Sequence, residues 1–363
     1  MIKNRLRANT VNAVLLIYAI LFALAGASCS RDEGQGTAGE RLRFEESIMG
    51  PFDTVTTLIA YTKDEAAFEQ FAALVKQDLD HYHKLFDFYN SYPGINNIST
   101  INEQAGKQPV PVDPAIIDFL EQCLWANDIS DGRVNMALGA VLSIWHDLRM
   151  QGIDDPATAV LPDPDALKLA NQHTDIRRVK LDKEAGTVFL TDPDMSLDVG
   201  SGAKGYACEL VAQHAIEAGY DSFVISLGGN IRAVGVKADS GAKWRIGIKN
   251  PDLDAQEQII DVLQVSDLAI VTSGVYERYY TVNGVKYHHI IDPDTLMPSQ
   301  YFDSVTVVAP SSATADAITT ALLNMSYPDG KEMLAQLENC EALWLKGTDR
   351  YSTEGYDELL GGQ

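Results

Sequence analysis

Residues 196–206 combine a glycine-rich loop and a lysine at the point where a helix is predicted to begin. The preceding segment Thr187–Leu190 reads as a strand, and residues 206–218 place apolar side chains at helical spacing. The first N–H groups of a helix attract anions, glycine lets the backbone approach a ligand closely, and Lys204 adds a positive charge. The segment therefore predicts a phosphate-binding loop. It matches neither of the common nucleotide-binding glycine motifs, so an ordinary turn is the alternative for this segment alone.

Residues 313–320 place two oxygen ligands on one face of a predicted helix. Asp316 and Thr320 are four residues apart, so their side chains lie one turn above each other. A carboxylate and a hydroxyl are hard ligands of the kind that Mg²⁺ prefers, above all next to a pyrophosphate. An aspartate on a helix is ordinarily a solvated surface residue. From these residues alone the surface interpretation is preferred, although the neighbours of Asp316 are apolar.

Three further segments have the composition of ligand-binding loops. Residues 227–230, L-G-G-N, follow the apolar run 223–225, so a buried strand ends where backbone N–H groups can face a ligand. Residues 272–278 read T-S-G-V-Y-E-R, and residues 287–293 read Y-H-H-I-I-D-P. The last segment supplies two adjacent histidines, the side chains best suited to proton transfer near neutral pH.

These segments, in this order, resemble the ApbE-like FAD:protein FMN transferases. The shared motifs are S-L-D-V-G-S-G-A-K-G-Y-A, L-G-G-N, T-S-G-x-Y-E-R, H-H-I-I-D-P and D-A-I-T-T, and the resemblance runs from about Met49 to Ala321. It implies a Mg²⁺-dependent enzyme that transfers FMN from FAD to a Thr or Ser hydroxyl of a target flavoprotein through a phosphoester bond, with release of AMP.

Two other functions use the same residues. An FAD pyrophosphatase would use water as the nucleophile and release FMN and AMP, and the motifs do not separate it from the transferase. A non-catalytic flavin-binding lipoprotein is the second alternative. The sequence disfavours it, because binding alone does not require a base.

The resemblance also implies roles for the metal ligands and the base. The positions that match the family's metal ligands are Asp316, Thr320 and Ser201, the last through its backbone carbonyl. For the base that activates the acceptor hydroxyl we expect His289 rather than His288, because neighbours in an extended segment face opposite sides. A structural histidine bonded to the backbone is the alternative at this position.

The remaining residues implied by the resemblance bind FAD. Met49 would contact the flavin ring or else belong to the core, Tyr89 has Tyr92 as its alternative, and Asp198 accepts from FAD or caps the glycine loop. Residues 132–137 read G-R-V-N-M-A where the family often has G-A-F-D-P-T, so this segment departs from the family pattern. The complete set is Met49, Tyr89, Arg133, Val134, Asn135, Asp198, Lys204 and Ile290, the last through its backbone.

The elements that must position these residues indicate an α+β domain with mainly antiparallel sheets. Residues 64–86 carry an apolar stripe at helical spacing, and Asp113 and Pro114 have the types expected at the start of a second helix that runs to Ile129. Residues 244–248 and 304–308 read as strands. Because strands and helices do not alternate regularly, a doubly wound parallel sheet is disfavoured. The family resemblance implies the same class, a single T-fold-like catalytic domain.

Composition limits the partners. The chain has 363 residues, 46% of them hydrophobic, enough for one large domain or two closely packed halves. Its net charge of −23 would repel nucleic acid, so we expect no nucleic-acid partner. Outside the N-terminal region, Cys123, Cys208 and Cys340 are odd in number and widely spaced, which predicts neither a disulfide framework nor a zinc site.

The N-terminus predicts export. Basic residues precede an apolar run at 11–25 and small residues at 26–28, the pattern of a signal peptide. Cys29 follows directly, which predicts a lipid anchor on the extracytoplasmic face of the membrane. Gly26 stands where such sites usually have leucine, so an uncleaved anchor or ordinary cleavage remain alternatives. We therefore expect a signal peptide at 1–28, a tether at 29–44, the catalytic domain at 45–350 and a C-terminal tail at 351–363.

Overall fold

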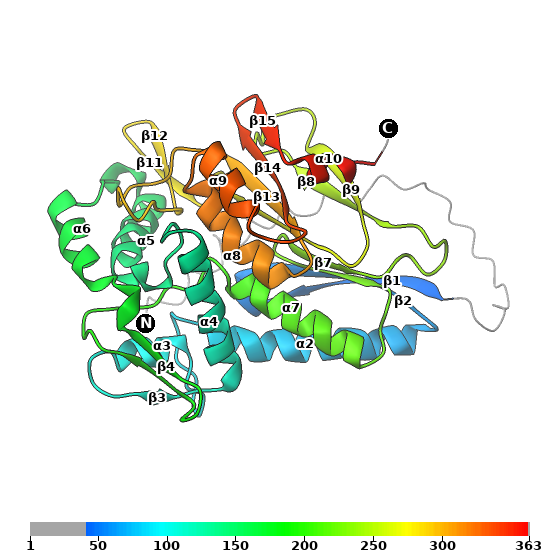
Figure 1. The fold of residues 1–363 in the computed structure, drawn as a ribbon, viewed down its shortest axis with the longest axis horizontal. Coiled ribbons are helices and arrows are strands. Elements are labelled where there is room, and N and C mark those ends of the chain that lie inside the picture. Colours follow the sequence, from blue (N-terminus) through cyan, green and yellow to red (C-terminus); the bar gives the residue numbers. More distant parts are fainter. Residues whose placement is uncertain (1–40, 362–363) are drawn as a thin grey trace, which may run out of the picture. The chain divides into compact units, whose positions relative to one another are not determined.

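An eight-stranded antiparallel sheet forms the centre of the fold in the computed structural model, which describes residues 41–361 (Figure 1). Its strands are β1 (Leu42–Met49), β2 (Val55–Thr62), β6 (Phe223–Leu227), β7 (Asn230–Val234), β10 (Ala269–Gly274), β13 (Ser304–Ala309), β14 (Glu341–Lys346) and β15 (Asp349–Ser352). They lie side by side in the order β1-β2-β6-β7-β10-β13-β14-β15. Every neighbouring pair is antiparallel, which confirms the predicted α+β class.

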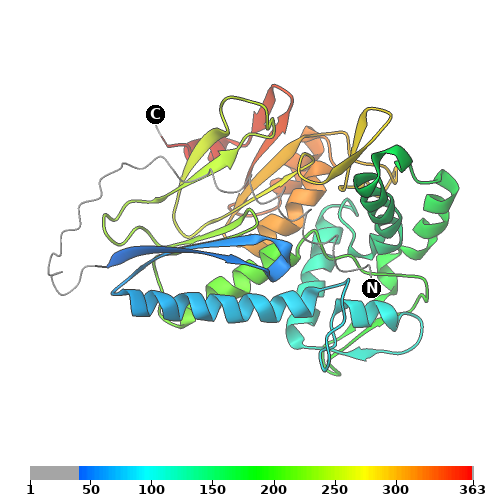
Figure 2. The ribbon, with the colours of Figure 1, turned by 180° about the vertical axis from the view of Figure 1, so that it is seen from behind.

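Helices cover one face of this sheet. They are α2 (Glu65–Phe86), α7 (Ala203–Glu217), α8 (Ser312–Leu323) and α9 (Tyr327–Leu334). Figure 2 shows α2 running along β1 and β2. Leu58 of β2, Phe71 of α2 and Val211 of α7 belong to one apolar cluster, while Ile318 of α8 and Val305 of β13 belong to a second. The helix face is therefore the larger part of the core.

The opposite face of the sheet is also buried. It is covered by the hairpin of β8 (Trp244–Lys249) and β9 (Ile259–Val265) and by α10 (Glu354–Glu358). Trp244 packs there against Tyr61 of β2, with ring centroids 5.8 Å apart, and Tyr356 of α10 belongs to the same apolar cluster. Burial on both faces explains why the strand at 223–227 reads as a continuous apolar run rather than an alternating one.

Most of the remaining described elements lie beside the sheet (Figure 1). They are α3 (Ile98–Glu103), α4 (Pro114–Ile129), the single turn η3 (Met136–Leu138), α5 (Gly139–Asp154), α6 (Pro164–Ala170), the small sheet β3 (Val110–Pro111), β5 (Thr187–Leu190) and β4 (Val179–Asp182), and the hairpin β11 (Tyr279–Val282) and β12 (Val285–His288). Trp145 of α5 and Tyr280 of β11 share an apolar cluster, which joins the hairpin to the helices.

The predicted helix starts are confirmed by their caps. The Asp64 side chain accepts from Ala67 N at the start of α2, and the Asp113 side chain accepts from Ala115 N at the start of α4. Each satisfies a backbone donor that the first helical turn leaves free.

The predicted domain edges need correction. Residues 42–44, assigned to the tether, are the first part of β1. This edge strand lacks an apolar pattern because its side chains are largely exposed and several are charged. Residues 351–361, assigned to a tail, contain the end of β15 and α10, where Tyr356 is fully buried. The predicted signal peptide and Cys29 lie outside the described residues. Within residues 41–361, no helix combines the length and apolar character needed to cross a bilayer.

Candidate active site

The predicted phosphate loop leads directly into α7. Gly202 is the N-cap residue, and the helix begins at Ala203, as the glycine pattern predicts. Asp198 Oδ1 accepts a hydrogen bond from Gly200 N at 2.9 Å. This carboxylate therefore caps the glycine loop, which was one of its two predicted roles.

A close contact between α7 and α8 brings Asp316 of α8 to the first turn of α7, which contains Lys204. Gly205 N donates to Asp316 Oδ2 at 2.7 Å, so the carboxylate satisfies a first-turn N–H group of α7. A Cβ atom on Gly205 would lie 2.2 Å from Asp316 Cβ, closer than two carbon atoms can approach. Only glycine allows this packing, and Lys204 lies next to it in the chain.

Asp316 has the surroundings expected of a cation ligand. Its side chain is buried, and burial raises its pKa, an effect that the positive charge of Lys204 opposes. Neither an ion pair nor a hydrogen bond to Oδ1 is formed within residues 41–361, so one carboxylate oxygen is available. Thr320 follows one turn later on α8, and Ser201 lies in the glycine loop; both are half-buried. These oxygen donors fit a hard divalent cation.

A second group of possible ligands lies elsewhere. His173, Asp192 and Asp194 have ligand atoms within 4.8 Å of one another. Asp192 is already paired with Arg178, and both of its oxygens lie 3.0 Å from Nδ1 of His173. A cation here would have to compete with a guanidinium for the one buried carboxylate, so this group is better explained as an ion-pair cluster.

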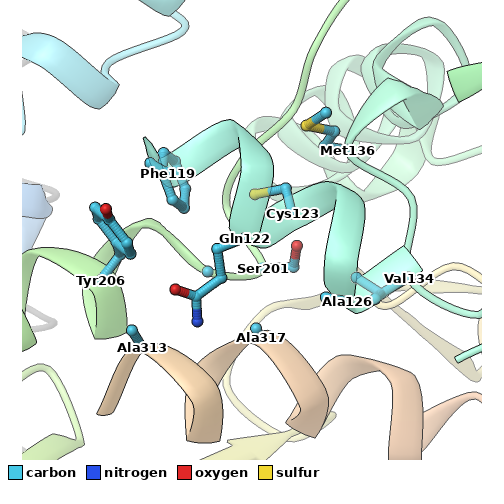
Figure 3. A pocket seen from close by; sticks show the side chains of 11 residues that line it. Phe119, Gln122, Cys123, Ala126, Val134, Met136, Ser201, Tyr206, Ala313 and Ala317 are labelled. Atoms are coloured by element: carbon cyan, nitrogen blue, oxygen red, sulfur yellow. The ribbon is translucent and has the colours of Figure 1, made fainter. Parts of the chain in front are cut away.

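A small apolar pocket opens beside the glycine loop (Figure 3). Side chains of α4 form one wall, and Ala313 and Ala317 of α8, which flank Asp316, form another. Ser201 reaches the pocket from the loop. The full lining is Phe119, Gln122, Cys123, Ala126, Val134, Met136, Ser201, Gly202, Tyr206, Ala313 and Ala317.

The two adjacent histidines have different surroundings. His288 is buried; its Nε2 donates to Ser299 O at 2.8 Å, and its Nδ1 accepts from Ile290 N at 3.3 Å, so both ring nitrogens are used. His289 is half-buried, and its Nδ1 donates to Arg278 O at 3.3 Å. Within the described part of the chain, Nε2 of His289 has no hydrogen-bond partner. Of the two, only His289 presents a ring nitrogen that can accept a proton.

The charge state of His289 follows from its neighbours. Burial, together with the positive charges of Arg278 and Arg149 and the neighbouring ring of His288, lowers its pKa to about 3. The ring is therefore neutral at physiological pH, which is the state that a general base requires.

Two of the side chains predicted to contact FAD are exposed. Met49 is 61% exposed and Tyr89 is 60% exposed, which excludes a core role for Met49. The hydroxyl of Tyr92 donates to Asp87 Oδ2 at 2.7 Å, whereas Tyr89 packs against His146 with ring centroids 5.3 Å apart. Tyr89 is therefore the better placed of the two tyrosines to meet a ligand.

Most of the other residues predicted to contact FAD already form hydrogen bonds or ion pairs within the protein. The side chain of Asn135 accepts from Ala137 N at 2.8 Å and donates to Thr174 O at 3.0 Å. Ile290, which was expected to bind through its backbone, donates its N–H to His288, and its carbonyl accepts from Ser299 N at 2.9 Å. Arg133 pairs with Asp294. Val134 is buried and lines the pocket.

The sequence interpretation missed a group of positive charges on this side of the site. Arg149 donates to Nδ1 of His146 at 3.1 Å, and the charge of Arg278 lowers the pKa of Arg149. Neither arginine forms an ion pair with a carboxylate of residues 41–361, although both act electrostatically on Asp198. Arg278 stands in the T-S-G-x-Y-E-R motif and could have been noticed. The α5 residues His146 and Arg149 carry no signal in the sequence.

Comparisons with known proteins indicate one family. Residues 52–344 match the model of the ApbE family. The chain is 38% identical over 263 residues to an FAD:protein FMN transferase of Treponema pallidum, covering 68% of this chain and 70% of the relative. It is 30% identical over 286 residues to an FAD:protein FMN transferase of Klebsiella pneumoniae, covering 78% and 84%.

A solved structure shows the same fold. The crystal structure of the ApbE protein of Thermotoga maritima superposes with a TM-score of 0.76 at 25% identity, covering 88% of this chain and 100% of that one. The residues that match the family model include the glycine loop, His289 and Asp316. The chain therefore belongs to the ApbE family.

Proposed function

We propose that this protein transfers FMN from FAD to a Thr or Ser hydroxyl of an acceptor flavoprotein and releases AMP. The observation that carries the proposal is the contact of Gly205 with Asp316, which sets a lysine and a buried carboxylate with a free oxygen at the start of one helix. His289, with an unused Nε2, supplies the base. The relatives that carry the name FAD:protein FMN transferase support the same activity.

The residues divide the chemistry between them. Asp316, Thr320 and Ser201 would hold Mg²⁺, which supplies positive charge next to the pyrophosphate when it is bound. Lys204 would offset the negative charge that develops at the phosphate oxygens. The exposed faces of Met49 and Tyr89 would meet the flavin ring.

In the transfer step, His289 accepts the proton of the acceptor hydroxyl. The acceptor hydroxyl oxygen attacks the phosphorus on the FMN side of the pyrophosphate, and its proton passes to Nε2 of His289. The bond from that phosphorus to the AMP phosphate breaks, and AMP leaves. A base with a pKa of about 3 is weak, but the negative charge of bound FAD would counteract Arg278 and Arg149 and raise that pKa.

We also propose that the protein works outside the cytoplasm, attached to the membrane through a lipid on Cys29. The N-terminal sequence supports this location. Mass spectrometry of the N-terminal peptide from membranes of the native cell tests it. A diacylated Cys29 is the expected result, and an intact N-terminus or an unmodified cleaved one would contradict the lipid anchor.

The transferase test uses a Thr-containing acceptor domain of a flavoprotein encoded by the same organism. It is incubated with the protein, FAD and Mg²⁺, and with EDTA in a parallel sample, and both are analysed by mass spectrometry. A metal-dependent mass gain of one FMN phosphoryl group on the acceptor, with one AMP released for each, is expected. AMP without acceptor modification would indicate a pyrophosphatase, and bound FAD with neither product would indicate a binding protein.

A further inference from the structure

Glu209 is a buried carboxylate of α7 to which the proposed chemistry assigns no role. It is 7% exposed and lies one turn after Gly205 on the same face of the helix. Its Oε2 accepts from Ser312 N at 2.8 Å and lies 3.3 Å from Ser312 Oγ. Glu209 therefore binds the first residue of α8.

Ser312 continues this connection to the candidate metal ligand. It lies one turn before Asp316 on α8, and its Oγ donates to Gly205 O at 2.8 Å. Gly205 N donates in turn to Asp316 Oδ2 at 2.7 Å. Facing turns of α7 and α8 are thus joined by a chain of hydrogen bonds that runs from Glu209 through Ser312 and Gly205 to Asp316.

The sheet holds Glu209 in place. Arg232 of β7 is also buried, and its Nε lies 3.3 Å from Glu209 Oε2. Arg232 Nη1 donates to Ala233 O at 2.9 Å, and within residues 41–361 Glu209 is the one carboxylate that forms an ion pair with this guanidinium. Two buried opposite charges that depend on each other resist displacement. Through Glu209, the start of α8 is connected to both α7 and β7.

We propose that Glu209 is a positioning residue for the metal site, which rests on the proposed function because it presupposes a cation at Asp316. By binding Ser312, Glu209 fixes the start of α8 so that Asp316 turns Oδ2 toward Gly205 and keeps Oδ1 for the cation. Groups that orient a metal ligand are commonly worth 10–100-fold in metal affinity. Because Glu209 acts through Ser312 rather than on Asp316 directly, we expect the lower end of that range.

The test measures metal binding rather than turnover. Mg²⁺ affinity is determined by calorimetry, and Mn²⁺ affinity by electron paramagnetic resonance, each without and with FAD. Glu209→Gln keeps the size and an acceptor oxygen but loses the charge, and Ser312→Ala loses only the hydroxyl. We expect Glu209→Gln to weaken binding of both metals by about tenfold and Ser312→Ala to weaken it by less.

A matched control separates positioning from stability. Asp261 accepts from Arg350 at 2.8 Å and from the Tyr356 hydroxyl at 3.0 Å on the opposite face of the sheet. Asp261→Asn should lower the melting temperature and leave metal affinity unchanged. If folded Glu209→Gln and Ser312→Ala bind Mg²⁺ as the wild type does, the inference is wrong. If the wild type binds no metal and transfers no FMN, the proposed function fails and the inference fails with it.

Discussion

Replacing Gly205 with alanine tests the contact on which the site depends. The added Cβ would lie 2.2 Å from Asp316 Cβ and 2.4 Å from Ser312 O. Carbon atoms pack at about 3.5–4.0 Å, so α7 and α8 would have to separate by about 1.5 Å. A shift of that size would stretch the bond from Gly205 N to Asp316 Oδ2 beyond hydrogen-bonding distance.

The magnitude follows from three terms. Overpacking in a core costs about 1–3 kcal/mol. Loss of a hydrogen bond to a buried charged group costs about 1.5–3 kcal/mol more. Alanine in place of glycine within a helix stabilises that helix by about 1 kcal/mol, which offsets part of this loss. The expected net loss of about 1.5–5 kcal/mol corresponds to a fall in melting temperature of about 2–7 °C for a domain of this size.

The assay compares Gly205→Ala with Glu217→Ala, an exposed substitution on the same helix. Thermal unfolding gives stability, and AMP release at increasing Mg²⁺ gives the metal dependence. We expect Gly205→Ala to need at least tenfold more Mg²⁺ for half-maximal rate, because Asp316 loses its orientation. A variant with the wild-type melting temperature and Mg²⁺ dependence would refute the packing argument, and so would an equal loss in Glu217→Ala.

Three further substitutions test individual roles. Asp316→Asn removes the carboxylate charge that would hold the cation, so AMP release should fall by more than about 100-fold. Because burial raises the pKa of this carboxyl, its charge is costly to bury, and the melting temperature of the variant should stay equal or rise. A large loss of stability would contradict this. His289→Ala should keep FAD affinity and slow transfer by about 10²–10⁴-fold, measured by acceptor mass gain, and an unchanged rate would exclude it as the base. Arg149→Gln removes a positive charge that lowers the pKa of His289 and of His146, so both values should rise in an NMR pH titration. In the wild type, His289 has a pKa of about 3 when folded and about 6.5 when unfolded, so the unfolded chain binds more protons between these values. Acidification from pH 6.5 toward 3 should therefore reduce stability, and a smaller reduction is expected in Arg149→Gln.

Local rules were enough to predict the elements that carry the site. Asp64 and Asp113 cap their helices through bonds to residues two or three positions away, so the signal is contained in a short segment. The glycine loop before α7 was predictable for the same reason. The edges of the domain could not be predicted in this way, because β1 is a polar edge strand and Tyr356 of α10 packs in a cluster formed by distant strands.

The two histidines show where local reasoning ended. Alternation along an extended segment predicted that only one of His288 and His289 faces the site. Which one does so depends on Ser299 and Arg278, which lie at least ten residues away along the chain and bond to the respective rings. The partner of Asn135 could not be predicted locally either, because its side chain donates to the backbone of Thr174 in another segment.

The sequence by itself determined the family, the order of the motifs and the chemical types of the groups, because these depend on residue identity and short spacing. Only the tertiary structure decided which groups meet. Gly205 and Asp316 are 111 positions apart, and a hydrogen bond and the absence of a Cβ atom join them. Arg149, Arg278 and His289 come from three separate segments, and their mutual electrostatic effect exists only once the chain has folded, since Coulomb energy depends on distance in space.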